Sequence, residues 1–312
     1  MFGDEGFRLK KRMSEQNKAS LLRRARAKFL SINLSIRLVE RNPASFLVGS
    51  YRASTYCTQT LLQSGREISS TYCKNRWCAV CNRIRTARLI NGYIQPLKAL
   101  QDPQFVTLTK QTVSADFLPM SIELMNKTWR TILNSREGRK RGLRGVRKIE
   151  CTVRPNGQYH YHFHVIIDGA ENAKWLINEW IKHLGKLVSH KAQDMRPADE
   201  GSLKELFKYF TKLTTPDKKL YDLQRMDVIF RALRGKRTYQ PFGGIAIVSE
   251  EIEGIRTEEL DFLSEQEQVW NWHVNDWIND AGEALTGYQP NEAFRQLFDD
   301  VDRNIIDQDT NT

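Results

Sequence analysis

Three of the six histidines alternate with other residues in one short run of the chain, Tyr159–Ile167. Successive side chains of a β-strand point to opposite faces, so His160, His162 and His164 would share one face. The aromatic and aliphatic residues between them would then point into a core. Neutral imidazole is a common ligand of divalent metal ions, and two imidazoles at i and i+2 can chelate one ion. The run therefore predicts a metal site on one face of a sheet.

A turn signal just before this run suggests a further ligand. Pro155–Gly157 suits a three-residue hairpin loop, with proline starting a type I turn and glycine in the left-handed region. This loop would place Glu150 opposite His162, on the metal face. A two-residue Asn-Gly turn would shift the register by one residue and point Glu150 to the other face. Glu150 is therefore a conditional ligand.

A second group of reactive side chains lies in the segment KELFKYFTK, residues 204–212. A helical step of about 100° per residue would bring Glu205, Tyr209 and Lys212 to one face. A tyrosine can attack a phosphodiester where a metal polarises the phosphate and a cation such as Lys212 favours the phenolate. Glu205 could accept a proton. Considered alone, this segment is better explained as an ordinary amphipathic helix. The histidine run is the reason to favour a catalytic role for it.

Four of the five cysteines lie close together in the chain, at Cys57, Cys73, Cys78 and Cys81. Thiolates are soft ligands, and four of them form a closed tetrahedral zinc site with no open position for water. Unrelated reduced thiols in a core are the alternative, since free cysteine is often buried. The clustering favours a structural zinc ion. Cys151 stands apart and is expected in the core.

The charge is divided unevenly along the chain. Residues 1–248 carry 45 Lys and Arg against 20 Asp and Glu, whereas residues 249–312 carry 3 against 17. A basic body of this size suggests a polyanionic partner, usually nucleic acid, and a merely solvated surface is the alternative. No apolar run is long enough for a membrane span, and the N-terminus is too polar for a secretory signal. We therefore expect a cytoplasmic protein that does not contact a membrane.

These groups need a scaffold, and the periodicity of apolar residues indicates one. The stretch Phe105–Thr109 alternates and is rich in β-branched residues, which predicts a strand, and the hairpin adds two more strands. Helices are expected at Arg83–Leu100 (ending near Pro96), Ser121–Asn134, Trp175–Val188 and Leu203–Leu213. The order of elements lacks a parallel βαβ rhythm. It favours an α+β fold in which helices flank an antiparallel sheet, with a small four-cysteine subdomain.

Composition and motifs divide the chain into four expected parts. These are a basic helical N-terminal segment (1–50), a cysteine and zinc subdomain with a helix (51–100), a catalytic domain (101–248) and an acidic C-terminal segment (249–312). The basic stretch RKRGLRGVRK, residues 139–148, is expected as an exposed loop that runs into a strand.

Over about residues 50–245 the chain resembles the replication initiators of rolling-circle plasmids, within the HUH endonucleases. The likeness is carried, in order, by CKNRWCAVC, FVTLT, RGVRKIECT, YHYHFHVII, ELFKYFTK and RALRGKRTYQPFGGI. The bulky Phe207 departs from the family, whose members often have a small residue there. The acidic C-terminal segment lies outside the likeness, and its role stays open.

The resemblance implies an HUH-type antiparallel sheet whose metal ion is held by His162 and His164, with either His160 or Glu150 as the third ligand. It implies that Tyr209 is the nucleophile, which cuts one strand at an origin and forms a 5′-phosphotyrosyl link. Glu205 would activate water when replication ends, and the freed 3′-hydroxyl would prime copying. Mg²⁺ and Mn²⁺ suit phosphate chemistry, and imidazole ligands favour Mn²⁺ of the two.

The same resemblance implies plasmid origin DNA, single-stranded or in a hairpin, as the substrate. Host helicase and DNA polymerase would be partners in a bacterial cytoplasm, and a homodimer stays open. A conjugative relaxase or an HUH-class transposase is a close alternative, but in relaxases the tyrosine usually precedes the histidines, and here Tyr209 follows His164. A non-catalytic, zinc-stabilised DNA-binding regulator is the non-enzymatic alternative.

Overall fold

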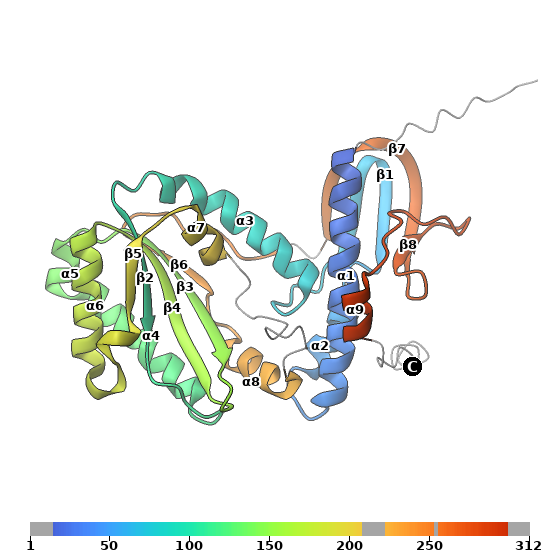
Figure 1. The fold of residues 1–312 in the computed structure, drawn as a ribbon. Helices are drawn as coiled ribbons and strands as arrows, with labels where there is room; N and C mark the ends of the chain where they lie inside the picture. Colours follow the sequence, from blue (N-terminus) through green and yellow to red (C-terminus); the bar gives the residue numbers. More distant parts are fainter. Residues whose placement is uncertain (1–14, 208–221, 253–254, 299–312) are drawn as a thin grey trace, which may run out of the picture. The chain divides into compact units, whose positions relative to one another are not determined.

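The computed structural model describes residues 15–207, 222–252 and 255–298. Contacts divide the chain into two compact units, one made of residues 1–83 with 251–312 and the other of residues 84–250 (Figure 1). The second unit spans the whole of the range expected as a catalytic domain, 101–248. The first unit differs from the expected division, since it joins the N-terminal segment, the cysteine region and the acidic C-terminal segment.

The second unit is built on a five-stranded sheet of order β5-β2-β4-β3-β6, in which all neighbours are antiparallel. The strands are β2 (Pro103–Thr109), β3 (Gly145–Val153), β4 (Tyr159–Asp168), β5 (Asp194–Pro197) and β6 (Tyr239–Phe242). The prediction of helices around an antiparallel sheet is confirmed. Residue patterns found β2, β3 and β4, but they missed the short edge strands β5 and β6.

The turn between β3 and β4 fixes the register of the metal face. Arg154 N donates to Gln158 O at 2.8 Å, and Gly157 N donates to Arg154 O at 2.8 Å. Gly157 adopts φ +82°, the left-handed region that the three-residue loop requires. Glu150 pairs with His162 across the hairpin. The predicted three-residue loop and its register are therefore confirmed.

One face of this sheet packs against α4 (Leu118–Asn134) and α6 (Ala170–Leu184). The ring of Phe163 lies 5.9 Å from that of Trp129 on α4 and 5.5 Å from that of Trp180 on α6. Tyr161 and Val165 are buried with Phe163, as the alternation predicts. Large aromatic rings therefore fill this side of the sheet. The side chains of the even-numbered residues of β4 lie on the other side.

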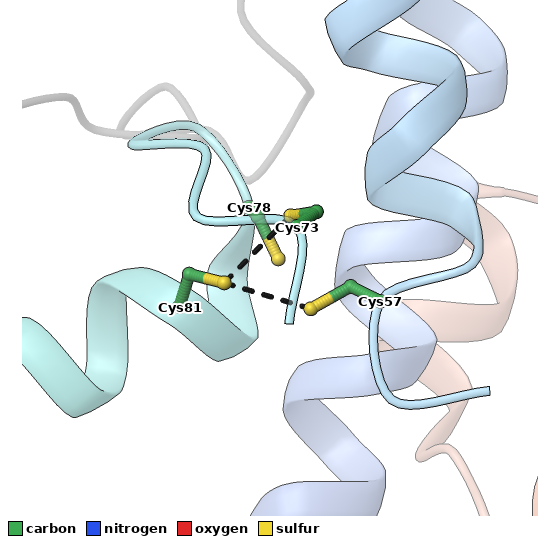
Figure 2. Close-up of side chains that lie close together, drawn as sticks. All are labelled: Cys57, Cys73, Cys78 and Cys81. Atoms are coloured by element: carbon green, nitrogen blue, oxygen red, sulfur yellow. Dashed lines mark hydrogen bonds between the residues drawn. The ribbon is translucent and has the colours of Figure 1, made fainter. Parts of the chain in front are cut away.

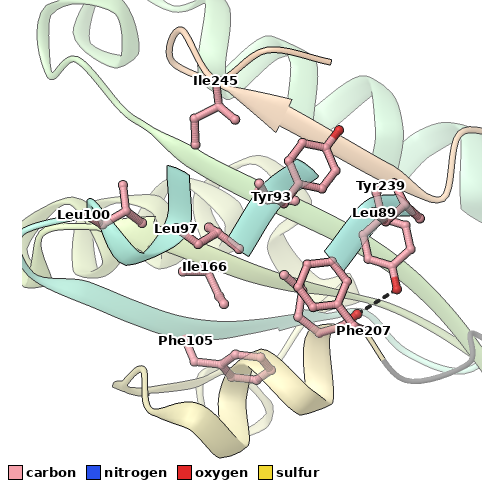
Figure 3. Packing of buried hydrophobic residues seen from close by; sticks show 11 residues of the cluster. Leu89, Tyr93, Leu97, Leu100, Phe105, Ile166, Phe207, Tyr239 and Ile245 are labelled. Carbon is pink, nitrogen blue, oxygen red and sulfur yellow. Dashed lines mark hydrogen bonds between the residues drawn. The ribbon is translucent and has the colours of Figure 1, made fainter. Parts of the chain in front are cut away.

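The opposite face carries the apolar cluster of Figure 3, which includes residues of α3 (Ala79–Lys98) and α7 (Glu200–Phe207). Tyr93 from α3, Ile166 from β4 and Leu206 from α7 are all buried there. Tyr239 Oη donates to the carbonyl oxygen of Leu206 at 2.8 Å. This bond and the cluster fix the end of α7 on the histidine-bearing side of the sheet.

The other helices described in this unit are α5 (Arg136–Lys140), α8 (Leu223–Leu233) and two short 3₁₀ turns, Gly185–Leu187 and His190–Ala192. The stretch 139–148 runs into a strand as expected, but α5 occupies its start, and residues 145–148 already belong to β3 and are buried rather than exposed. Ser135 Oγ caps α5 by accepting from Gly138 N. Helix α3 also continues past Pro96 to Lys98.

The first unit contains a three-stranded antiparallel sheet of order β1-β7-β8. Its strands are β1 (Thr60–Thr71), β7 (Ile255–Asn271) and β8 (Asp276–Ile278), and its helices are α1 (Glu15–Arg41), α2 (Val48–Thr55) and α9 (Glu292–Leu297). The middle of α1 is buried on nearly every side. Among the helices that the structure describes, none is long and apolar enough to cross a membrane.

Candidate functional site

Glu150, His162 and His164 form a compact group of metal-ligand type on the sheet of the second unit. One ligand atom from each lies within 4.8 Å of the others. The two histidines alternate along β4, and the confirmed register brings Glu150 of β3 to their face. All three side chains are largely buried, with exposures of 5%, 7% and 9%. Two imidazoles and a carboxylate form a donor set that suits a divalent ion such as Mn²⁺.

Hydrogen bonds orient the two imidazoles. His162 Nδ1 lies 3.2 Å from the carbonyl oxygen of His160, which can only accept, so the proton of His162 is on Nδ1. His162 Nε2 therefore keeps its lone pair. His164 Nδ1 lies 3.3 Å from Thr107 Oγ1, and its Nε2 lies 3.5 Å from Glu150 Oε2. Both rings are held through Nδ1, which is how metal-ligating histidines are commonly positioned.

Burial and neighbouring charges set the protonation states that a cation site needs. Burial, aided by the nearby His164, lowers the pKa of His162 to about 3. Burial alone would raise the pKa of Glu150, but the hydrogen bond from His164 and the charge of Lys148 outweigh it and lower this pKa to about 2. At neutral pH the His162 imidazole is neutral and the Glu150 carboxyl is ionised. Both are the forms that bind a metal ion.

Lys148 is a member of the site that the sequence reasoning missed. Its ammonium group is fully buried, 3.1 Å from Glu150 Oε2 and 3.3 Å from the backbone oxygen of Glu205. It thus connects a candidate metal ligand to the last turn of α7. The signal was available, because Lys148 lies two residues before Glu150 on the same strand and therefore shares its face.

His160 occupies a different environment from the other two histidines. Its Nδ1 lies 3.0 Å from Arg154 Nη2, which can only donate, and its ring stacks on that of His162 with centroids 4.8 Å apart. Burial and the charge of Arg154 lower the pKa of His160 to about 4. His160 lies outside the group of three converging ligand atoms. Of the two predicted third ligands, the geometry favours Glu150.

The predicted tyrosine group is described only in part. Glu205 lies on α7 and is half-buried, while Tyr209 and Lys212 lie outside the described residues. Phe207 stacks on Tyr239 with centroids 5.6 Å apart and an interplanar angle of 18°. The bulky side chain therefore has a packing role at the end of α7.

The four cysteines of the first unit converge as predicted (Figure 2). Cys81 Sγ lies 3.5 Å from Cys57 Sγ and 3.7 Å from Cys73 Sγ, and all four sulfur atoms lie within 4.8 Å of one another. Sulfur ligands at ~2.3 Å from one tetrahedral zinc ion would be about 3.8 Å apart. The spacing and the four thiols therefore fit a closed structural zinc site.

Helix α1 supplies polar groups around the cysteines. Ser31 Oγ donates to Cys78 Sγ at 3.2 Å. The fully buried Lys28 Nζ donates to Thr55 O at 2.7 Å, and burial lowers its pKa to about 8 against the opposing influence of the neighbouring cysteines. A zinc ion with four thiolates carries a net charge of −2, which the Lys28 ammonium would partly offset. Sequence reasoning assigned no such role to α1.

Together, the fold and these two groups define a two-unit α+β protein with a Glu/His/His group and a four-cysteine group, both able to hold a metal ion.

Comparison with known proteins points to replication proteins. Residues 66–173 match a family model described as "Replication protein". A curated "Protein rep" of Lentilactobacillus hilgardii is 29% identical over 102 residues, which are 31% of this chain and 32% of that protein. A "Protein rep" of Staphylococcus aureus is 25% identical over 178 residues, 51% of this chain and 77% of that protein. No solved structure matches.

The predicted resemblance to replication initiators is therefore confirmed. The family model matches residues 66–173 of the chain. The matched segment contains Glu150, the histidine run and three of the four clustered cysteines; Cys57 and α7 lie outside it. The chain spans about a third of the length of the first of these relatives.

Proposed function

We propose that this protein initiates rolling-circle replication of a plasmid by nicking one strand of its origin DNA. The observation that carries the proposal is the buried Glu150, His162 and His164 group, within a segment that matches a replication protein model. It is supported by the basic character of residues 1–248, which suits a DNA partner. The proposed activity is that of an HUH-type endonuclease and strand transferase.

In the proposed reaction the Tyr209 phenolate attacks the scissile phosphorus. The bond from phosphorus to the 3′-oxygen breaks, the 5′-phosphate becomes linked to Tyr209, and the 3′-oxygen takes up a proton. A bound Mn²⁺ or Mg²⁺ would supply charge withdrawal from a non-bridging phosphate oxygen. Lys212 favours the phenolate, and Glu205 accepts a proton from water when the linkage is hydrolysed at termination.

The described residues support this assignment through the position of α7. Lys148 contacts both Glu150 and the Glu205 backbone, so the last described turn before Tyr209 is held beside the metal group. Tyr239 holds the next carbonyl, that of Leu206. The proposed role of Lys148 is to keep Glu150 ionised and to position the segment that carries the nucleophile.

The remaining assignments complete the proposal. The four cysteines bind a structural zinc ion, the substrate is origin DNA in single-stranded or hairpin form, and host helicase and DNA polymerase continue replication in a bacterial cytoplasm. The cysteine group supports the zinc assignment through its sulfur spacing.

The test is a time course with a labelled single-stranded origin oligonucleotide and Mn²⁺ or Mg²⁺, in which covalent adduct and free product are followed separately. Tyr209→Phe removes only the phenol oxygen, so DNA binding should persist and the adduct should disappear. Tyr221→Phe is the matched control and should form normal adduct. A normal yield in Tyr209→Phe would move the nucleophile elsewhere, and wild-type binding without any adduct would favour a non-catalytic regulator.

Glu205→Ala separates the two steps of the same reaction. Adduct formation needs no water, so it should proceed, whereas hydrolytic release should fall by roughly 10²-fold or more and the adduct should accumulate. Equal loss of both steps, with rescue by excess Mn²⁺, would instead assign Glu205 to the metal site.

A further inference from the structure

A cavity of about 400 Å³ lies on the face of the sheet that the Glu150 group does not use. Arg147 and Ile149 line it from β3, where they alternate with Lys148 and Glu150 and therefore point to the opposite side. The other walls come from α4 and from the turn between α8 and β6. Its volume is in the range that holds small ligands.

The lining of this cavity is strongly basic. Its charged residues are four cations, Arg130, Arg147, Lys236 and Arg237, and a single carboxylate, Glu123. Three of the cations are exposed at the opening, whereas Arg147 is only 3% exposed. One carboxylate does not balance the three arginines, so the lining of the cavity favours an anion.

Arg147 is the feature that points to a ligand. Its Nη1 donates to Asn126 Oδ1 at 2.9 Å and its Nη2 to Gln240 Oε1 at 2.7 Å, and both acceptors are neutral amides. Its guanidinium packs over the ring of Phe163 at 4.2 Å. Within the described part of the chain, no carboxylate forms an ion pair with Arg147, and its buried Nε lacks a hydrogen-bond partner.

A buried charge without a counter-ion is costly, and a protein rarely keeps one without a use. The two amides fix the guanidinium plane, and the aromatic ring supports its face. The geometry is thus preset before any anion binds, which lowers the cost of binding. Guanidinium groups match the oxygen geometry of phosphate particularly well.

We propose that this cavity binds the phosphate group of a nucleotide, either free or as one unit of a DNA strand. Arg147 supplies the buried positive charge, and Arg130 and Arg237 contact the phosphate oxygens from the opening. The site lies on the other face of the sheet from the proposed nicking centre. Its occupation therefore does not depend on Tyr209 or on a metal ion.

The test is calorimetric titration of the full chain, with its proposed zinc ion retained, in buffer without added Mn²⁺ or Mg²⁺, so that no added metal ion occupies the Glu150 group. Thymidine monophosphate and a short oligothymidine should bind, and thymidine, which lacks phosphate, should bind at least about tenfold more weakly. Tighter binding of the oligonucleotide, weakened by the cavity variants below, identifies a DNA strand as the source of the phosphate, and tighter binding of the mononucleotide identifies a free nucleotide. Equal binding of thymidine and its monophosphate would overturn the proposal.

Variants locate the binding to this cavity. The pair Arg130→Gln and Arg237→Gln, at exposed positions, should weaken binding of thymidine monophosphate by about tenfold or more. The pair Arg139→Gln and Lys140→Gln on α5 removes the same charge at exposed positions outside the cavity, and it should change affinity less than about twofold. Equal losses in the two pairs would show general electrostatic attraction and would overturn the assignment.

Discussion

At the scale of single residues, the candidate metal site depends on a lysine that no ligand motif contains. Lys148 is completely buried and ion-paired with Glu150, so the metal-free site has an internal counter-charge. The ligands themselves could be predicted, because strand alternation and the turn type fix which side chains share a face. The choice between Glu150 and His160 as the third ligand could not be predicted, because it depends on the contact of His160 with Arg154.

The first prediction concerns this ion pair. Lys148→Met should destabilise the metal-free protein by about 3–5 kcal/mol, because it leaves the Glu150 carboxylate buried without its partner. Excess Mn²⁺ should restore much of this loss, since a bound cation replaces the missing positive charge. The measurement is denaturant unfolding with and without Mn²⁺, with Lys140→Met, an exposed lysine on α5, as the control. A loss that Mn²⁺ leaves unchanged would mean that Lys148 acts through packing alone.

At the scale of elements, the β3–β4 hairpin decides whether the site exists. Its three-residue loop sets the register that brings Glu150 to the histidine face. The sequence specified this element well because proline, asparagine and glycine each have a distinct turn preference. Strands β1 and β7 were missed for the opposite reason: they are polar segments that pair with each other across a long separation in the chain. Local periodicity carries little information about such pairing.

The second prediction tests this turn. Gly157→Ala should lower the free energy of unfolding by about 1–2 kcal/mol, because alanine is disfavoured at a positive φ. The affinity for Mn²⁺ should stay unchanged, since the loop length and register are kept. The tip of the flexible Arg225 side chain is the nearest group to the new methyl and can move aside. Gly49→Ala, at an exposed position within α2, should instead stabilise by up to about 1 kcal/mol. Loss of Mn²⁺ binding in Gly157→Ala would show that the register needs glycine itself.

At the scale of the whole molecule, the two candidate metal sites belong to different units and should be separable. The four cysteines are in the first unit, and the Glu150 group is in the second. Sequence motifs located both sites. The motifs could not predict that the acidic C-terminal segment shares a unit with the cysteines, because that depends on the β1–β7 pairing.

The third prediction follows from this separation. Cys78→Ser should lower bound zinc and reduce the thermal stability of the first unit, while Mn²⁺ binding at the Glu150 group is retained. Cys151→Ser is the matched control: it makes the same change at a buried cysteine of the second unit and should leave bound zinc unchanged. Elemental analysis and thermal unfolding provide the readouts. Purified wild-type protein without zinc would contradict the assignment and leave the Glu150 group unaffected.

The pairing of β1 with β7 has a consequence for the order in which the chain can fold during synthesis. Thr60 pairs with Val269 and Thr71 with Ile255, so the partner of β1 is translated only after the whole second unit, residues 84–250. The five described strands of the second unit are all present by then, and this unit can fold first. Until β7 emerges, the backbone donors and acceptors of β1 lack this partner strand, and an unpaired strand edge favours aggregation. A chain released from a ribosome before residue 255 would therefore have the five described strands of one unit and an unpaired strand in the other.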